Sequence, residues 1–179
     1  LALATVGGLS AFGYNALAVN TTGANNTAIG TFALSMNTTG SGHVALGYST
    51  LTSMVSANDC IAIGDRALTA CTADGNIAIG ARSGISLTTG TDNVFVGRDT
   101  GADCVTSIGV VAIGTVAANH AAGNYTVSVG YRSCETASTA LGVTAVGAFS
   151  LQNNTAANNS AFGNNALLLN TTGTRNTAA

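Results

Sequence analysis

The chain has 179 residues, of which 46% are hydrophobic and only 7% are charged, and its formal net charge is −2. Phosphate binding requires clustered Lys and Arg, but Lys is absent and the five Arg are scattered, so we expect no nucleic-acid partner. No apolar run approaches the ~18 residues of a membrane-spanning helix, so we expect no membrane insertion. The hydrophobic content also argues against intrinsic disorder.

A short motif ending in Gly recurs along the whole chain. Its final residues, called the marker glycines below, are Gly13, Gly30, Gly47, Gly64, Gly80, Gly97, Gly114, Gly130, Gly147 and Gly163. Successive marker glycines are 17 or 16 residues apart, and such regularity indicates a repeat architecture. We expect an all-β, parallel β-solenoid with coils of 16–17 residues. Residues 1–179 would form a single array of about ten coils.

The three residues before each marker glycine are expected to form a strand. The last of the three is large and apolar in every coil, and the first is Ser, Thr, Val or Ile. Alternate residues of a strand share a face, so we expect these two positions to line the solenoid interior. The predicted core column is Phe12, Ile29, Leu46, Ile63, Ile79, Val96, Ile113, Val129, Val146 and Phe162.

The middle strand residue is Ala in eight of the ten coils, with Phe95 and Ser128 as the exceptions. A solvent-facing position would tolerate Lys, Glu or Gln, none of which occurs there. We therefore expect this face to pack against neighbouring chains. The predicted oligomer interface is Ala11, Ala28, Ala45, Ala62, Ala78, Ala112, Ala145 and Ala161.

The second half of each coil is less regular. Leu stands four residues after the marker glycine in most coils, but Gly84, Gly101, Ala118 and Cys134 replace it in the middle of the chain. A turn such as Asn20-Thr21-Thr22-Gly23 then follows. Coils this short and rich in Gly, Thr and Asn cannot hold two helices, and the hexapeptide and calcium-binding nonapeptide patterns do not match. We expect a flattened coil of two short strands.

Residues 26–30 read Asn-Thr-Ala-Ile-Gly, and Ala33-Leu34 and Asn37-Thr38-Thr39-Gly40 follow. This pattern resembles the head repeats of YadA-like trimeric autotransporter adhesins and, more closely, related arrays in bacteriophage tail fibres. The resemblance spans essentially the whole chain. It implies a left-handed parallel β-roll assembled as a homotrimer and displayed outside a cell, on a virion or cell surface. Such a segment would bind a host cell-surface or extracellular-matrix receptor and catalyse nothing.

Two features depart from the adhesin pattern. The repeat is longer than the usual adhesin head repeat, and the sequence shows no neck, stalk or anchor, which favours a phage or other fibre. Residues 176–179 break off before the next marker glycine is due, so we expect the array to be a fragment of a longer fibre.

Catalytic, cofactor and metal sites are not predicted. Cys71 and Cys104 share a phase but lie two coils apart, at ~9.6 Å, which is too far for a disulfide. We expect the four cysteines, which include Cys60 and Cys134, to be small apolar fillers. His43 and His120 fall in different phases, with no repeating partner.

The charged residues predict a charged stripe on the surface, and we expect no catalytic pair among them. Asp59 and Asp92 share a phase but lie two coils apart, so we expect solvated turn residues. A charged stripe is predicted along one corner, one or two residues after the marker glycines: Asp65, Arg66, Arg82, Arg98, Asp99 and Arg132. It would keep the rod soluble or contribute to a receptor-binding surface.

The sequence leaves two alternatives to an adhesive fibre. One is the subunit of another extracellular filament. The other is an ice-binding solenoid, because Thr-Thr pairs recur, although only four of ten coils carry a pair in the relevant phase.

Overall fold

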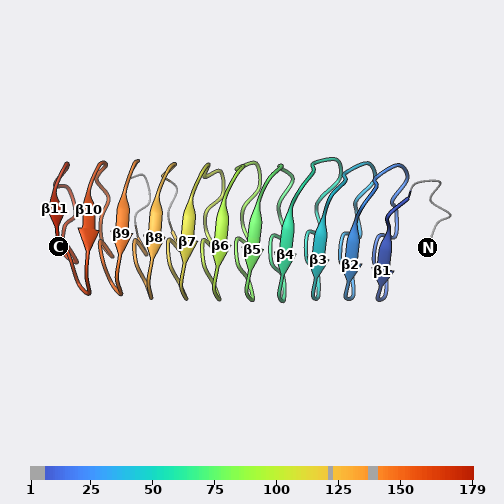
Figure 1. Cartoon of the computed structure of the whole chain (residues 1–179), viewed down its shortest axis with the longest axis horizontal. Helices are drawn as coiled ribbons and strands as arrows, with labels where there is room; N and C mark the ends of the chain where they lie inside the picture. Colours follow the sequence, from blue (N-terminus) through green and yellow to red (C-terminus); the bar gives the residue numbers. More distant parts are fainter. Residues whose placement is uncertain (1–6, 121–122, 137–140) are drawn as a thin grey trace.

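The computed structural model describes residues 7–120, 123–136 and 141–179. Over these residues the chain winds into a rod of about ten stacked coils that contains strands and turns but no helix (Figure 1). No segment of the described chain is therefore a helix able to cross a membrane. The parallel solenoid and the repeat period predicted from the sequence are confirmed.

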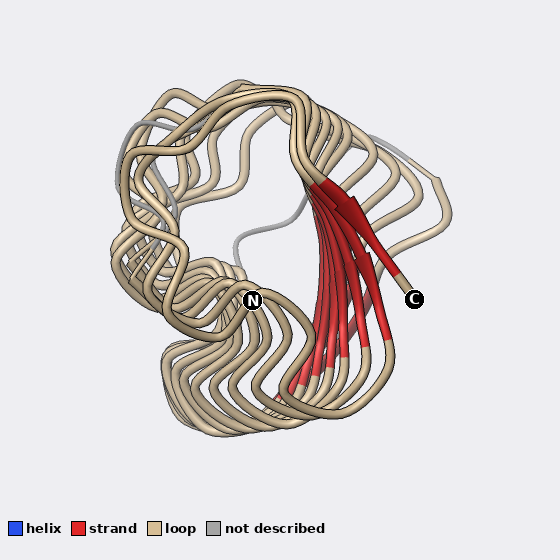
Figure 2. Ribbon diagram, turned by 90° about the vertical axis from the view of Figure 1, so that its left-hand side faces the viewer, coloured by secondary structure: helices blue, strands red, loops and turns tan. Residues whose placement is uncertain are grey.

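Each coil contributes one short strand to a single parallel sheet. The strands are β1 Ser10–Phe12, β2 Thr27–Ile29, β3 Val44–Leu46, β4 Ile61–Ile63, β5 Ile77–Ile79, β6 Val94–Val96, β7 Val111–Ile113, β8 Val127–Val129, β9 Thr144–Val146, β10 Ser160–Phe162 and β11 Thr177–Ala178. They follow one another in sequence order, in register, so that Ala28 pairs with Ala45 and Ile29 with Leu46. Viewed along the rod, they stack on one side of a closed ring of turns (Figure 2).

The second strand expected in each coil is absent from the described residues. The segment after the marker glycine is a series of turns with left-handed residues, such as Phe32 (φ 61°) and Leu34 (φ 50°). Its amides still bond between coils: Phe32 N donates to Tyr14 O of the preceding coil (2.9 Å) and Leu34 N to Thr50 O of the following one (3.0 Å). Left-handed residues bend the chain sharply enough to close a short ring while the backbone hydrogen bonds keep running along the rod.

The predicted orientation of the strands is wrong. The middle residues of the strands from β2 to β10 point into the solenoid and are buried, whereas the residues directly before the marker glycines lie on the outer face of the sheet. Phe12 is 77% exposed, Phe162 46% and Ile29 44%. The outer residues, which we predicted as a core column, are Phe12, Ile29, Leu46, Ile63, Ile79, Val96, Ile113, Val129, Val146 and Phe162.

The predicted alanine interface is wrong for the same reason. Seven of the eight alanines are buried inside their own chain, and Ala11, in the first coil, is partly buried. They therefore cannot contact another chain. The interior alanines are Ala11, Ala28, Ala45, Ala62, Ala78, Ala112, Ala145 and Ala161.

The narrow interior explains this orientation. In most coils the leucine four residues after the marker glycine fills it; Leu34, Leu51 and Leu68 are fully buried. An alanine at the middle strand position leaves room for the leucine that faces it across the coil, because side chains in protein interiors are densely packed.

Phe95 is the exception that shows how little space there is. It replaces the interior alanine in β6 and is fully buried, and the leucine position is glycine in its own coil and in the preceding one, at Gly101 and Gly84. A Cβ atom at Gly101 would lie 2.5 Å from Phe95 Cε1, and one at Gly84 would lie 2.9 Å from Phe95 Cδ2. One phenylalanine therefore takes the space of two leucines.

The marker glycines allow the coils to stack. Gly47 has φ 137°, a conformation that side chains disfavour, and a Cβ there would lie 2.5 Å from Gly64 O of the next coil. Gly163 has a similar φ of 122°, but a Cβ there would meet nothing within 4 Å. Glycine is thus required twice over inside the stack, by conformation and by contact.

We predict that Phe95→Ala lowers the free energy of unfolding by about 3–5 kcal/mol, because it leaves a cavity beside Gly84 and Gly101. Gly101→Leu alone should also destabilise the chain strongly, since the new side chain enters the Phe95 ring. The double variant Phe95→Ala/Gly101→Leu gives the sixth coil the combination of alanine and leucine that Ala62 and Leu68 form in the fourth coil. It should recover much of the lost stability. Denaturant unfolding measures all three, and additive losses in the double variant would contradict this packing.

We predict that Gly47→Ala is more damaging than Gly163→Ala. Both variants carry the backbone strain of a disfavoured φ, about 1–3 kcal/mol, but only the first also forces two coils apart. Thermal unfolding of the two variants compares them directly. Equal losses of stability would show that the carbonyl contact between coils does not matter.

Candidate functional site

The outer face of the sheet is a regular surface that runs along the rod. It consists of the first and third residues of β1 to β10, and we call it the strand face. In β4 to β7 these residues are all Ile or Val, and at both ends Ser and Thr occupy the first position. No charged residue lies at either position in any of the ten strands. Each side chain shields its neighbours above and below, yet Ile79 (39%) and Ile113 (41%) remain exposed.

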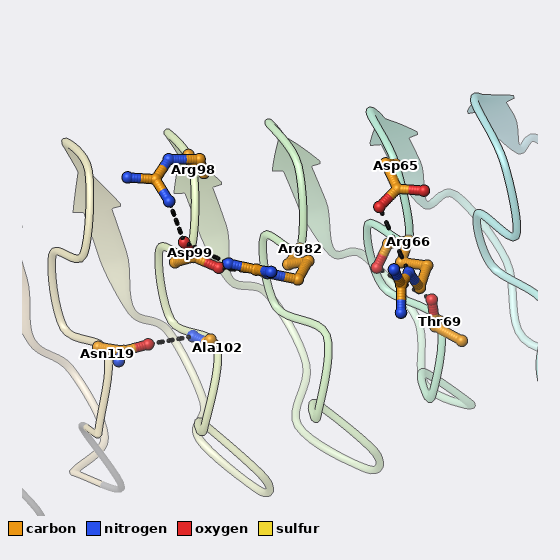
Figure 3. A network of polar contacts seen from close by, with 8 residues as sticks. All are labelled: Asp65, Arg66, Thr69, Arg82, Arg98, Asp99, Ala102 and Asn119. Carbon is orange, nitrogen blue, oxygen red and sulfur yellow. Dashed lines mark hydrogen bonds and ion pairs between the residues drawn. The ribbon is translucent and has the colours of Figure 1, made fainter.

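A charged corner borders the strand face, where the chain leaves each marker glycine. Figure 3 shows Asp65, Arg66, Arg82, Arg98 and Asp99 on successive coils, as the sequence predicted. Arg82 bridges two coils: its Nε and Nη2 donate to the two carboxylate oxygens of Asp99 at 2.6 and 2.9 Å. Arg98 Nη1 donates to the same carboxylate at 2.9 Å.

The electrostatics of this corner centre on Asp99. The hydrogen bonds from Arg82 lower the pKa of Asp99, and the carboxylate in turn raises the pKa of Arg82. The guanidinium groups remain about half exposed, so water screens these pairs and they add little to stability. Arg132, farther along the same corner, lies over the Tyr131 ring at 5.6 Å from its centroid.

Aromatic side chains occupy the same corner on both sides of the charged coils. Tyr14 and Phe32 pack edge to face with 5.6 Å between centroids, and Phe32 contacts Tyr48 at 6.3 Å. Tyr131 and Phe149 form a similar pair at 5.3 Å. Sequence analysis missed these pairs, although the recurrence of Tyr and Phe one or two residues after marker glycines would have revealed them. The corner therefore presents an aromatic, a charged and a second aromatic stretch along the rod.

Polar side chains inside the rod extend the hydrogen bonding between coils. Asn26 Oδ1 accepts from His43 N (2.9 Å), and Asn26 Nδ2 donates to Gly40 O (2.8 Å). His43 takes the same place in the next coil: its Nδ1 accepts from Cys60 N (3.2 Å) and its Nε2 faces Ala57 O (2.8 Å). Because Nδ1 accepts, the proton of the neutral ring lies on Nε2. His43 is thus a structural substitute for Asn.

The remaining predicted candidates do not converge on a site. His120 lies on the surface, paired with Asp103 (2.6 Å), and Asp59 and Asp92 are exposed turn residues with left-handed backbones. All four cysteines are buried. Cys60 and Cys71 contact each other inside one coil, a proximity the sequence analysis did not predict. Among the described residues no group of three or more His, Cys, Asp or Glu could hold a metal ion.

The threonine pairs have a structural role. Thr21 Oγ1 donates to Thr38 O (2.9 Å), and Thr38 Oγ1 donates to Val55 O (3.0 Å). Each of these hydroxyl groups therefore forms a hydrogen bond with a backbone carbonyl of the following coil. Thr155 Oγ1 does the same toward Thr171 O (2.9 Å).

Comparison with known proteins gives no match, whether with protein-family models, curated proteins or solved structures. The surfaces described above are therefore the basis of the functional interpretation.

We predict that His43 makes the protein sensitive to mild acid. Burial lowers the pKa of His43, against opposing effects of the Ala57 carbonyl and of Asp59. The unfolded chain, with a His pKa of about 6.5, then binds the proton more readily, so stability falls as pH drops below that value. His43→Asn, which copies Asn26, should melt at a temperature that changes less between pH 7 and pH 5. Because the variant keeps His120, equal slopes in both proteins would contradict this role for His43.

Proposed function

We propose that this chain is a structural and adhesive fibre segment, a phage tail fibre or a trimeric adhesin head, that assembles with copies of itself and displays a surface for attachment. The observation that carries this proposal is the strand face, which is uncharged along the whole rod and entirely apolar in its middle. Large exposed apolar patches on soluble proteins mark interaction sites. A surface whose function was simple solubility would carry Lys, Glu or Asp here.

The occupant best suited to the strand face is a second copy of the chain. The face repeats in register over ten coils, and a partner that covers all of it must be equally long and have the same spacing between coils. A copy of this chain meets both conditions. Three copies around a common axis, each with its strand face turned inward, would cover all three strand faces. The number three comes from the resemblance to YadA-like heads and tail-fibre arrays.

The charged and aromatic corner would then flank the interface and remain outside the assembly. Its Tyr, Phe and Arg side chains are residue types enriched in binding surfaces, and their order along the rod offers a distinct chemical pattern. We propose that this corner contributes to recognition of a host cell-surface or matrix receptor. The proposed segment acts outside the cell, on a virion or cell surface, and acts by binding, without catalysis.

We predict opposite outcomes for two neighbouring substitutions in β4. Ala62→Asp places a charge in the dry interior and should abolish the fold. Ile63→Asp places the same charge on the strand face and should leave a folded chain that no longer assembles. Circular dichroism with thermal unfolding reports the fold, and light scattering reports the assembly.

Arg82→Ser, on the corner, is the matched control and should neither unfold nor dissociate the protein. An Ile63→Asp protein that assembles like the unmodified chain would contradict the proposed interface. An Ala62→Asp protein that folds normally would contradict the orientation of the strands.

A further inference from the structure

Two cysteines meet inside one coil. Cys60 lies four residues before Gly64 and Cys71 seven residues after it, and both side chains are fully buried. Both thiols reach the same carbonyl oxygen: Cys60 Sγ donates to Ala73 O at 3.2 Å and Cys71 Sγ at 3.5 Å. The two thiols therefore share one hydrogen-bond acceptor within a single coil.

This meeting is a property of the fold. The equivalent side chains in the second coil, Asn26 and Asn37, both donate to Gly40 O, at 2.8 and 2.9 Å. In the last coil Asn159 and Asn170 likewise both donate to Gly173 O, at 2.7 and 2.9 Å. The solenoid thus brings these two positions to one carbonyl oxygen in the second, fourth and last coils.

Cysteine occupies both positions in one described coil alone. Cys104 is equivalent to Cys71, but its partner position holds Asn93, and Cys134 stands at the leucine position of its coil. Cys60 and Cys71 therefore have a geometry that the other two cysteines lack.

We propose that Cys60 and Cys71 are a disulfide-forming pair that staples the fourth coil of the rod under oxidising conditions. The oxidant is a small-molecule disulfide such as oxidised glutathione. One cysteine thiolate attacks a sulfur of the oxidant and displaces a glutathione thiolate, which gives a mixed disulfide. The second cysteine, after losing its proton, attacks the protein sulfur and displaces the other glutathione thiolate. Two protein thiols are oxidised, and one disulfide is reduced to two thiols.

In the folded coil Asn76 lies beside Cys71 and the acceptor that the two thiols share. Asn76 Nδ2 donates to Cys71 Sγ at 3.5 Å. Oxidation removes both thiol protons from Ala73 O, but Asn76 Nδ2, at 3.4 Å, still donates to it. Because both sulfurs are buried, the exchange takes place while the coil is open, before or during folding.

Thiol counting tests the proposal. The chain is refolded in a mixture of oxidised and reduced glutathione, quenched with acid, denatured and alkylated with N-ethylmaleimide. The expected intact mass shows alkylation of two of the four cysteines, Cys104 and Cys134, and a peptide map without reductant joins Cys60 to Cys71. Reductant should lower the melting temperature of the oxidised protein.

Matched variants use residues that already occupy these positions. Cys60→Val copies Val110 and Cys71→Leu copies Leu87, both buried at the equivalent place in other coils, so the variants are expected to fold. Each should show three alkylated cysteines and a melting temperature that reductant does not change. Cys104→Leu should retain the cross-link and show a single alkylated cysteine.

Four alkylated cysteines in folded, oxidant-treated protein would overturn the proposal, as would a cross-link between other cysteines or between chains. Because the assay supplies the oxidant, the outcome does not depend on extracellular display or on assembly. A cross-linked protein that stays monomeric would keep this inference and contradict the proposed function.

Discussion

The space inside the coil is the constraint on which the rest of the structure depends. In each coil of about 17 residues the middle strand residue shares the interior with the residue four positions after the marker glycine, which is leucine in most coils. The middle strand residue is therefore small in most coils. Phe95 fits because positions 84 and 101, which its ring contacts, are both glycine. The large residues of each strand are consequently on the outside.

This constraint links the fold to the proposed function. The large side chains at the first and third strand positions lie along one face of the rod, and in-register stacking aligns them into a continuous surface. The close approach of marker glycines fixes the register, and buried side chains such as Asn26 and His43 extend the hydrogen bonding between coils. Stacking therefore creates the surface that copies of the chain are proposed to cover.

The sequence was enough to predict the period, the parallel sheet and the position of every strand between Ser10 and Phe162, because marker glycines record the coil directly. It did not determine which strand face is inside. The alternation of Ala62 with Ile61 and Ile63 fits either orientation, and the usual preference for large residues inside favoured the wrong one. The pairing of Phe95 with Gly84 and Gly101 was the available signal. The meeting of Cys60 with Cys71 depends on ring closure, which spacing alone does not reveal.

The central claim is that the exposed strand face is covered by copies of the chain. Sedimentation equilibrium of the unmodified protein tests it most directly, because the measured mass does not depend on molecular shape. We expect a single species of three times the 17.5 kDa chain mass over a wide range of concentration. A folded rod with the mass of one chain at all concentrations would contradict it.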